Sequence, residues 1–172
     1  MSLNLYDLSV PVFIRALGQL KEVLQIAEKW AKDNNVDEKK LTEGKIIDDM
    51  LPFPFQIQSC CNTAKGILFR IGGEENVPVE DNEKTFAEFI ARVDSTIAVL
   101  KKAQREKFVQ PDAQITMKFG PKELQFQALK YIQNFAIPNF FFHQMTAYSI
   151  LRKEGVKVGK LDYLGAKDLQ NA

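Results

Sequence analysis

The chain has 172 residues, a length that favours one domain spanning residues 1–172 with enough material to bury its own core. Hydrophobic residues make up 45% and charged residues 26% of the chain, which excludes a disordered, collagen-like or disulfide-dense protein. Lys and Arg total 23 against 22 for Asp and Glu, so we expect no nucleic-acid partner. The single His excludes every mechanism that needs two imidazoles.

The start of the sequence lacks the features of a secretory signal. Residues 1–12 contain Asp7 and no Lys or Arg, and no stretch of the chain reaches the ~20 apolar residues of a membrane span. The two cysteines, Cys60 and Cys61, are adjacent, and a disulfide between neighbours strains the peptide that joins them. We therefore expect two free thiols, a cytoplasmic protein and no membrane partner.

Apolar residues recur at steps of three and four in the first part of the chain, the period of one helix face. This pattern predicts a helix from Val10 to Lys32, with Pro11 in its first turn. Asp37 can then cap a short helix that ends near Leu41. The apolar stripe of the long helix consists of Phe13, Leu17, Leu20, Leu24, Ala27 and Trp30.

Two further long helices are predicted in the middle of the chain. One starts near Pro54 and is stopped by Gly72-Gly73. The other is capped by Asp81 or Asn82 and ends in the basic residues 101–105, which suit the negative end of a helix dipole. Their apolar stripes are Ile57, Cys61, Ala64, Leu68 and Ile71 in the first, and Phe86, Phe89, Ile90, Val93, Ile97 and Leu100 in the second.

The hydrophobic period changes to two between residues 110 and 128. Ile115 and Met117 alternate with polar residues, as do Leu124 and Phe126, and a Gly-Pro pair separates the two runs. Alternation around a turn signal predicts a short β-hairpin over residues 114–127.

The helical period returns after the hairpin. A brief helical piece is expected over residues 128–135, followed by a last long helix with Pro138 in its first turn and Gly155 as its stop. Residues 156–172 have no long periodic run and are expected to wrap the molecule as extended chain. The predicted fold is therefore all-α: a four-helix up-down bundle with a short β-hairpin and an extended C-terminal tail.

The last long helix carries the one His of the chain. His143 shares a helix face with Phe140 and Ala147, and Asn139 lies one turn earlier on the same side. His143 is thus a core-edge residue bonded to a neighbouring helix, a pocket residue that orients a ligand or moves a proton, or a metal ligand. An imidazole can orient a ligand or move a proton near neutral pH, as the pocket interpretation requires.

Several motifs resemble a known family. They are Pro138–His143, Thr146–Tyr148 and Gly159–Gly165, with further matches at Asp49–Phe53 and in Asp81–Phe86. Together they are similar to a bacterial and fungal domain of unknown function that is grouped with the DinB/YfiT-like metalloenzyme superfamily. The resemblance covers nearly the whole chain and implies a bundle of DinB type that is often dimeric.

The resemblance also implies where a metal would bind. DinB proteins use three His, one on the second helix and a His-x-x-x-His pair on the last. Here the pair is Asn139-x-x-x-His143, and the second helix offers Cys60, Cys61 and Asn62 instead of His. Amides are weak ligands for zinc or nickel, and a catalytic zinc usually has three protein ligands. We therefore expect a degenerate metal site with no metal ligands and no cofactor.

Three function hypotheses follow. The first is a pocket for a small apolar or aromatic molecule, with His143 as the residue that binds or transfers a proton. His143 should then hydrogen-bond near Asn139, or to a second-helix side chain such as Gln58 or Asn62. The ligand-binding residues expected around it are Asn139, Tyr148, Gln58, Asn62 and Phe142.

The other two hypotheses are a metal-dependent transferase of DinB type with substituted ligands, and a non-catalytic dimeric interaction protein. Phe140, Phe141 and Phe142 cannot all face one core at helical spacing, so at least one must contact a ligand, a neighbouring element or a second subunit. Exposed aromatic patches mark contact sites, and we therefore expect a homodimer. Whether the protein is an enzyme stays open at this point.

Overall fold

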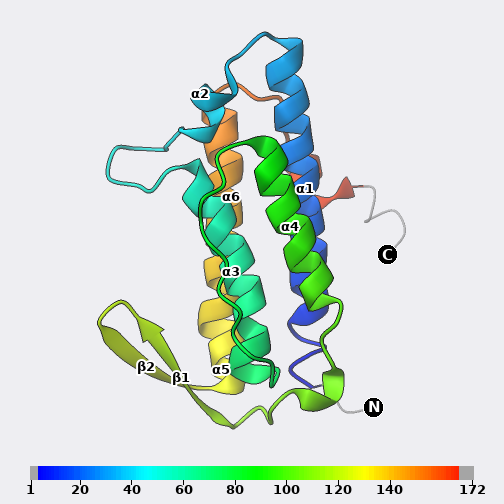
Figure 1. The fold of residues 1–172 in the computed structure, drawn as a ribbon, viewed down its shortest axis with the longest axis vertical. Coiled ribbons are helices and arrows are strands. Elements are labelled where there is room, and N and C mark those ends of the chain that lie inside the picture. The colour runs from blue at the N-terminus through cyan, green and yellow to red at the C-terminus, as the bar shows by residue number, and fades with distance from the viewer. Residues whose placement is uncertain (1–3, 167–172) are drawn as a thin grey trace.

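Four long helices lie side by side in the structure, a computed structural model that describes residues 4–166 (Figure 1). They are α1 (Val10–Asp33), α3 (Phe53–Ile71), α4 (Phe86–Leu100) and α6 (Ile137–Lys153). The shorter elements are α2 (Glu38–Thr42), the 3-10 turn η1 (Arg105–Lys107), α5 (Ala128–Tyr131), the π-helical segment η2 (Ile132–Ala136) and α7 (Lys160–Leu164). The predicted four-helix bundle is confirmed. No helix among the described residues combines the length and the apolar content that crossing a membrane requires.

The bundle does not alternate strictly between up and down. Phe53 at the start of α3 packs against Phe86 at the start of α4, with ring centroids 5.9 Å apart, so these two helices run in the same direction. Residues 72–85 return along the bundle to make this possible (Figure 1). Fourteen extended residues can span roughly 46 Å, whereas a helix of the length of α3 is roughly 28 Å long. The order is therefore up, down, down, up.

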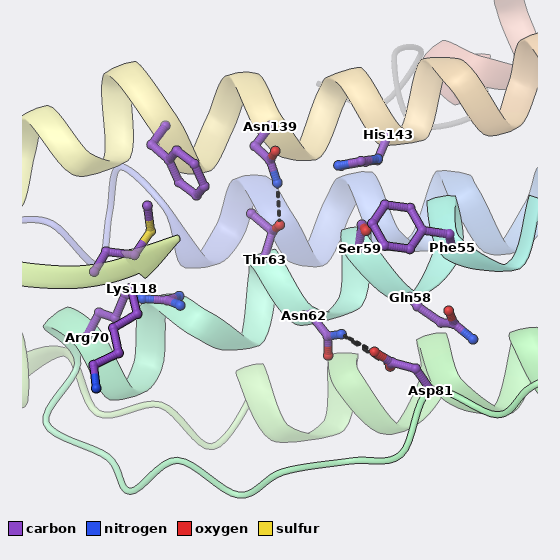
Figure 2. Close-up of a pocket in the computed structure, with 12 residues that line it drawn as sticks. Phe55, Gln58, Ser59, Asn62, Thr63, Arg70, Asp81, Lys118, Asn139 and His143 are labelled. Carbon is purple, nitrogen blue, oxygen red and sulfur yellow. Dashed lines mark hydrogen bonds between the residues drawn. The ribbon is translucent and has the colours of Figure 1, made fainter. Parts of the chain in front are cut away.

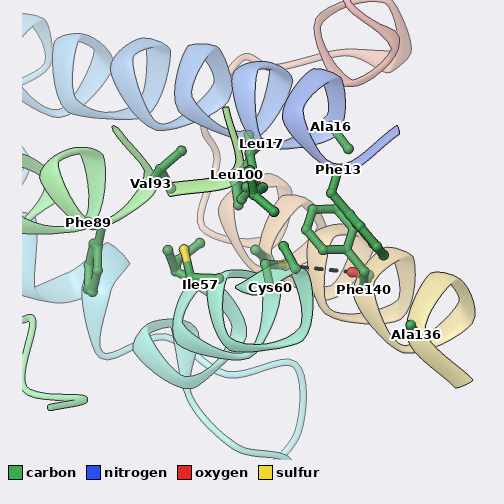
Figure 3. Packing of buried hydrophobic residues seen from close by; sticks show 14 of the residues in the cluster. Phe13, Ala16, Leu17, Ile57, Cys60, Phe89, Val93, Leu100, Ala136 and Phe140 are labelled. Atoms are coloured by element: carbon green, nitrogen blue, oxygen red, sulfur yellow. Dashed lines mark hydrogen bonds between the residues drawn. The ribbon is translucent and has the colours of Figure 1, made fainter. Parts of the chain in front are cut away.

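An aromatic core holds the four helices together. Phe13 of α1 and Phe140 of α6 lie 5.1 Å apart between ring centroids, and both are fully buried (Figure 3). Cys60 faces this core, with its sulfur 3.6 Å from the carbonyl oxygen of Phe140. Cys60 and Cys61 are both free and buried, and burial raises the pKa of the Cys61 thiol to about 11. The core therefore contains two protonated, unreactive thiols.

The predicted hairpin is present as β1 (Gln114–Phe119) and β2 (Lys122–Gln127). The strands are antiparallel, with Ile115 opposite Phe126 and Met117 opposite Leu124. The tight turn places Gly120 at a φ of 57°, a left-handed conformation that glycine adopts at little cost. Met117 is only 2% exposed because β1 packs against α3.

The last helix does not start at Pro138. α5, η2 and α6 form one continuous helical run from Ala128 to Lys153, and Pro138 lies inside it. Proline removes a backbone N–H and its ring clashes with the carbonyl one turn earlier in a regular α-helix. The π-helical turn over residues 132–136 changes the hydrogen-bond spacing just before Pro138, so the helix continues.

Two termini also differ from expectation. Thr85, not Asp81 or Asn82, caps α4, and it forms a capping box with Glu88. The described part of the tail contains the short helix α7 after an extended stretch. The rest of the expected extended tail, residues 167–172, lies outside the described residues.

Candidate functional site

A pocket of about 400 Å³ lies between α3 and α6 (Figure 2). The sequence folds this way because small and polar residues recur on one face of α3, where α6 packs against it. The hairpin closes one end. The lining residues are Phe55, Gln58, Ser59, Asn62, Thr63 and Arg70 from α3, Asp81 from the following loop, Met117 and Lys118 from β1, Phe135 from η2, and Asn139 and His143 from α6.

His143 is held in one tautomer by a glutamine. Its Nδ1 lies 2.8 Å from Oε1 of Gln56, and Nε2 of Gln56 donates a 2.8 Å hydrogen bond to the carbonyl oxygen of Leu51. A carbonyl oxygen can only accept, so this second bond orients the amide and turns Oε1 toward the imidazole. Nδ1 must therefore carry the proton, and Nε2 keeps its lone pair.

Aromatic rings surround the imidazole. Phe55 and Phe142 contact it edge-on, with centroid distances of 5.6 and 5.2 Å. Burial lowers the pKa of His143 below its ordinary value of 6.5, because the charged imidazolium loses hydration. His143 is therefore neutral at neutral pH and offers a basic nitrogen.

Asn139 occupies the middle of the pocket. Its Nδ2 donates a 2.8 Å hydrogen bond to Oγ1 of Thr63 across the helix interface (Figure 2). The bond leaves the amide oxygen of Asn139 as an acceptor for a bound molecule. The bond also fixes the position of α6 along the axis of α3.

Arg70 lies at the hairpin end of the pocket. Its guanidinium donates a 3.1 Å hydrogen bond to the Tyr131 hydroxyl and lies 4.4 Å from the centroid of the Phe69 ring. Figure 2 shows the guanidinium lying along α3 on the pocket side. This end of the pocket therefore carries a positive charge.

On the α4 side, the pocket is bordered by a network of ion pairs around Arg92. Arg92 of α4 lies within 2.9 Å of a carboxylate oxygen of Asp81 and 2.8 Å of one of Glu83. It also donates to the side-chain oxygen of Asn62 and the backbone oxygen of Glu80. This network anchors the loop before α4 against α3.

Four of the residues expected from sequence line the pocket, namely His143, Asn139, Gln58 and Asn62. His143 does bond a side chain of the second long helix, as expected, but that side chain is Gln56 and not Gln58 or Asn62. Gln58 bonds Glu83 at 3.1 Å and Asn62 bonds Asp81 at 3.0 Å. Both therefore face the loop before α4.

Tyr148 and Phe142 do not line the pocket. Tyr148 packs against Tyr163 of α7, with ring centroids 5.6 Å apart, and the Phe142 side chain is 57% exposed. An α-helix turns about 100° per residue, so positions one before and five after His143 point away from its face. Their assignment to the pocket is corrected on this ground.

Sequence reasoning missed Gln56, Ser59, Thr63 and Arg70. Positions 59, 63, 66 and 70 repeat at steps of four, three and four, and this polar and small stripe was visible in the sequence. It becomes informative only once α6 is known to cover that face.

The donor atoms near His143 come from amides and hydroxyls. Among residues 4–166, no group of three or more His, Cys, Asp or Glu side chains could hold a metal ion. The two thiols of α3 are buried, and Cys60 faces the Phe140 backbone instead of the pocket.

Comparison with known proteins gives two matches. The sequence profile "Domain of unknown function (DUF1993)" matches residues 5–164. A crystal structure of a DinB family member protein from Shewanella denitrificans is 34% identical, with a TM-score of 0.83, and the match covers 93% of this chain and 91% of that one. No curated protein matches the chain. The resemblance inferred from the motifs is thereby confirmed: the chain belongs to the DUF1993 family and has the fold of a DinB family member.

Proposed function

We propose that this protein binds a small molecule in the α3–α6 pocket and that His143 accepts a hydrogen bond or a proton from it through Nε2. The observation that carries the proposal is the bond from Nδ1 to Gln56, which leaves Nε2 as the acceptor. A lowered pKa keeps this nitrogen unprotonated at neutral pH. The ligand therefore presents a donor group to His143.

The pocket walls favour a ligand with an apolar or aromatic body. Phe55 and Phe135 belong to the lining from opposite helices, while Asn139 offers an amide oxygen. Apolar walls with a few placed polar groups are typical of small-molecule sites. Binding is the function supported best, and proton transfer is the chemistry that His143 would add.

A metal-dependent transferase of DinB type is the alternative, and the donor set does not fit it. The side chain that bonds His143 is the neutral amide of Gln56, and Asn139 directs its nitrogen, not its oxygen, toward α3. Zinc and nickel prefer imidazole and thiolate. We therefore propose that the metal site is degenerate in this chain.

A homodimer is a second proposal, supported by exposed apolar side chains of α3 and α6, of which Phe55 also lines the pocket. Phe142 and Met145 on the outer side of α6 are 57% and 45% exposed, and Phe55 of α3 is 39% exposed. Patches of this kind mark interaction surfaces. Light scattering should give twice the 19.6 kDa chain mass, and Phe142→Ser should return it to one chain mass. The two free thiols fit a cytoplasmic location.

Nuclear magnetic resonance of the imidazole tests the main proposal. Since the chain has one His, every imidazole signal belongs to His143. We expect the neutral form with the proton on Nδ1, a titration midpoint below 6.5, and a shift of the Nε2 signal when phenol is added. Anisole, which has the same ring without the O–H donor, should bind more weakly and leave Nε2 unshifted.

Two variants sharpen this experiment. Gln56→Leu removes the partner of Nδ1 and should release the tautomer preference. Gln58→Leu is the matched change on the same helix and should keep it, because Gln58 bonds Glu83 instead. A proton on Nε2 in the wild type, or an unchanged Nε2 signal with phenol, would contradict the proposal.

A further inference from the structure

We infer that the Arg70 end of the pocket is an anion subsite that binds a carboxylate group of the ligand. The inference rests on the proposed function, because it names the chemical class of the molecule that occupies the same pocket. It adds a second recognition point at the opposite end from His143.

The position of the guanidinium is the first observation. Arg70 stands in the last turn of α3 and folds back toward the preceding turn instead of extending into solvent. A Cβ placed on Gly66 would lie 2.2 Å from NH1 of Arg70, so the absence of a side chain at Gly66 provides the space that Arg70 occupies. The chain thus keeps the cation at the pocket wall.

The partners of Arg70 are the second observation. Its hydrogen-bond partner is the neutral hydroxyl of Tyr131, and its other contacts are the faces of the Phe69 and Tyr131 rings. Among the ion pairs formed by residues 4–166, none involves Arg70. A guanidinium has five N–H donors, so most of them remain for a ligand. A half-buried cation without a counter-charge favours an anion.

The acid in the pocket lining does not supply that counter-charge. Asp81 is engaged by Arg92 at 2.9 Å and accepts from Asn62 at 3.0 Å, on the α4 side of the pocket. Lys118 of β1 belongs to the same hairpin end as Arg70 and adds positive charge there. The two ends of the pocket therefore differ in charge.

The number of donors favours a carboxylate. One planar guanidinium matches a planar monoanion in two parallel hydrogen bonds. The Tyr131 hydroxyl is fully buried and accepts from Arg70, so it holds the guanidinium in place and leaves the other N–H donors of Arg70 for the ligand. A doubly charged phosphate would need a second engaged cation, whereas Lys118, the other cation at this end of the pocket, is exposed to solvent.

The spacing of the two ends defines the rest of the ligand. The bond between Asn139 and Thr63 aligns the two helices. His143 lies one turn from that level in one direction, and Gly66, over which Arg70 folds, lies three residues away in the other. At 1.5 Å per residue the two recognition points are roughly 10 Å apart. The ligand is thus a carboxylate joined through an apolar segment to a hydrogen-bond donor.

Phloretate is a suitable probe, because it carries a phenol at one end and a carboxylate at the other. Its primary amide keeps the phenol and removes the charge. Calorimetric titration of the wild type should show phloretate binding about tenfold or more tightly than the amide, the size expected of charge-assisted hydrogen bonds. Both compounds should shift the Nε2 signal of His143.

Four variants test whether the preference for phloretate depends on the charge and position of Arg70. Arg70→Gln should abolish the preference for phloretate while the amide affinity stays unchanged, and Arg70→Lys should retain part of the preference. Gly66→Ala should reduce it as well, because the methyl group occupies the place of the guanidinium. Lys101→Gln removes the same charge from the exposed end of α4 and should change nothing.

The outcomes distinguish this inference from the proposed function. Equal affinity for phloretate and its amide, or a preference that survives in Arg70→Gln, would overturn the anion subsite. If both compounds still shift His143 in that case, the proposed pocket stands. Failure of both compounds to bind would overturn both.

Discussion

Two arginines on neighbouring helices show opposite uses of the same side chain. The side chain of Arg92 is 4% exposed and bonds two carboxylates, an amide oxygen and a backbone carbonyl oxygen. Arg70 is half-buried and donates to one neutral hydroxyl. A buried charge is tolerated only when it is fully paired, so the Arg92 network is structural. The incomplete pairing of Arg70 leaves binding capacity at the wall of a pocket.

The comparison also explains why the pocket has a defined shape. The Arg92 network ties the loop before α4 to Asn62 on α3, one edge of the pocket. His143 and Asn139 form the other edge through their bonds to α3. Polar groups that hold the pocket are thus satisfied by the protein, while Nε2 of His143 and most donors of Arg70 have no partner among the described residues and would serve the proposed ligand.

The largest expected effect tests the structural arginine. Arg92→Met should reduce the free energy of unfolding by about 3 kcal/mol or more, because it leaves the nearly buried carboxylate of Glu83 without its cation. Arg70→Gln should change it by less than about 1 kcal/mol. Urea denaturation of both variants measures the difference. Equal losses in the two proteins would remove the distinction between the two arginines.

Gly66→Ala should separate stability from binding. Alanine is favoured over glycine in a helix interior by about 1 kcal/mol, and the atom in its way is the far end of a flexible side chain. The variant should therefore be up to ~1 kcal/mol more stable while binding carboxylates more weakly. Gly18→Ala in α1 is the matched control: a Cβ there meets nothing within 4 Å, so it should stabilise without affecting binding. A Gly66→Ala protein with undiminished carboxylate affinity would argue against the role of that space.

The smallest effect concerns pH. The pKa of His143 is lower in the folded protein than its ordinary value of 6.5, so the unfolded chain binds the proton more readily. The contribution of neutral His143 to the free energy of unfolding is therefore fully present above pH 6.5 and is lost as the pH falls through the folded-state pKa. Denaturation curves of the wild type between pH 7 and pH 5 should show this loss, and those of His143→Gln should show less of it.

A second acid-sensitive group lies outside that window. The hydrogen bond from Arg105 lowers the pKa of Asp7 to about 2, so its contribution is lost at more acidic pH in both proteins. A wild-type curve that matches His143→Gln from pH 7 to pH 5 would show that the imidazole is not desolvated by folding.

Local patterns predicted most elements because local physics governs them. The three-four spacing in α1 and the alternation around Gly120 reflect one-sided burial, which any packing partner would satisfy. Pro138 was misjudged because a π-helical turn relieves its clash with the preceding turn, and no pattern in the sequence announces that turn. The Asp81 cap failed for another reason, since the side chain of Arg92 in α4 forms an ion pair with that carboxylate.

The site was predicted in part. His143 and Asn139 share a helix face, so their convergence followed from spacing alone. Gln56 could not be chosen over Gln58 from sequence, because the choice depends on how α3 is rotated against α6. Arg70 was overlooked because it is identified as a recognition residue by having no carboxylate partner, and only the folded structure shows which partners a side chain has.

By itself, the sequence determined the helices, the hairpin, the two free thiols and a single imidazole on the inner side of the last helix. These follow from periodicity and composition, which act over a few residues. The tertiary structure alone decided that α3 and α4 run parallel, that Gln56 holds the tautomer of His143, and that Arg92 rather than Arg70 receives the carboxylates. Those outcomes depend on contacts between different elements, such as Gln56 and His143, which are 87 positions apart, and there the geometry of packing decides which polar groups meet.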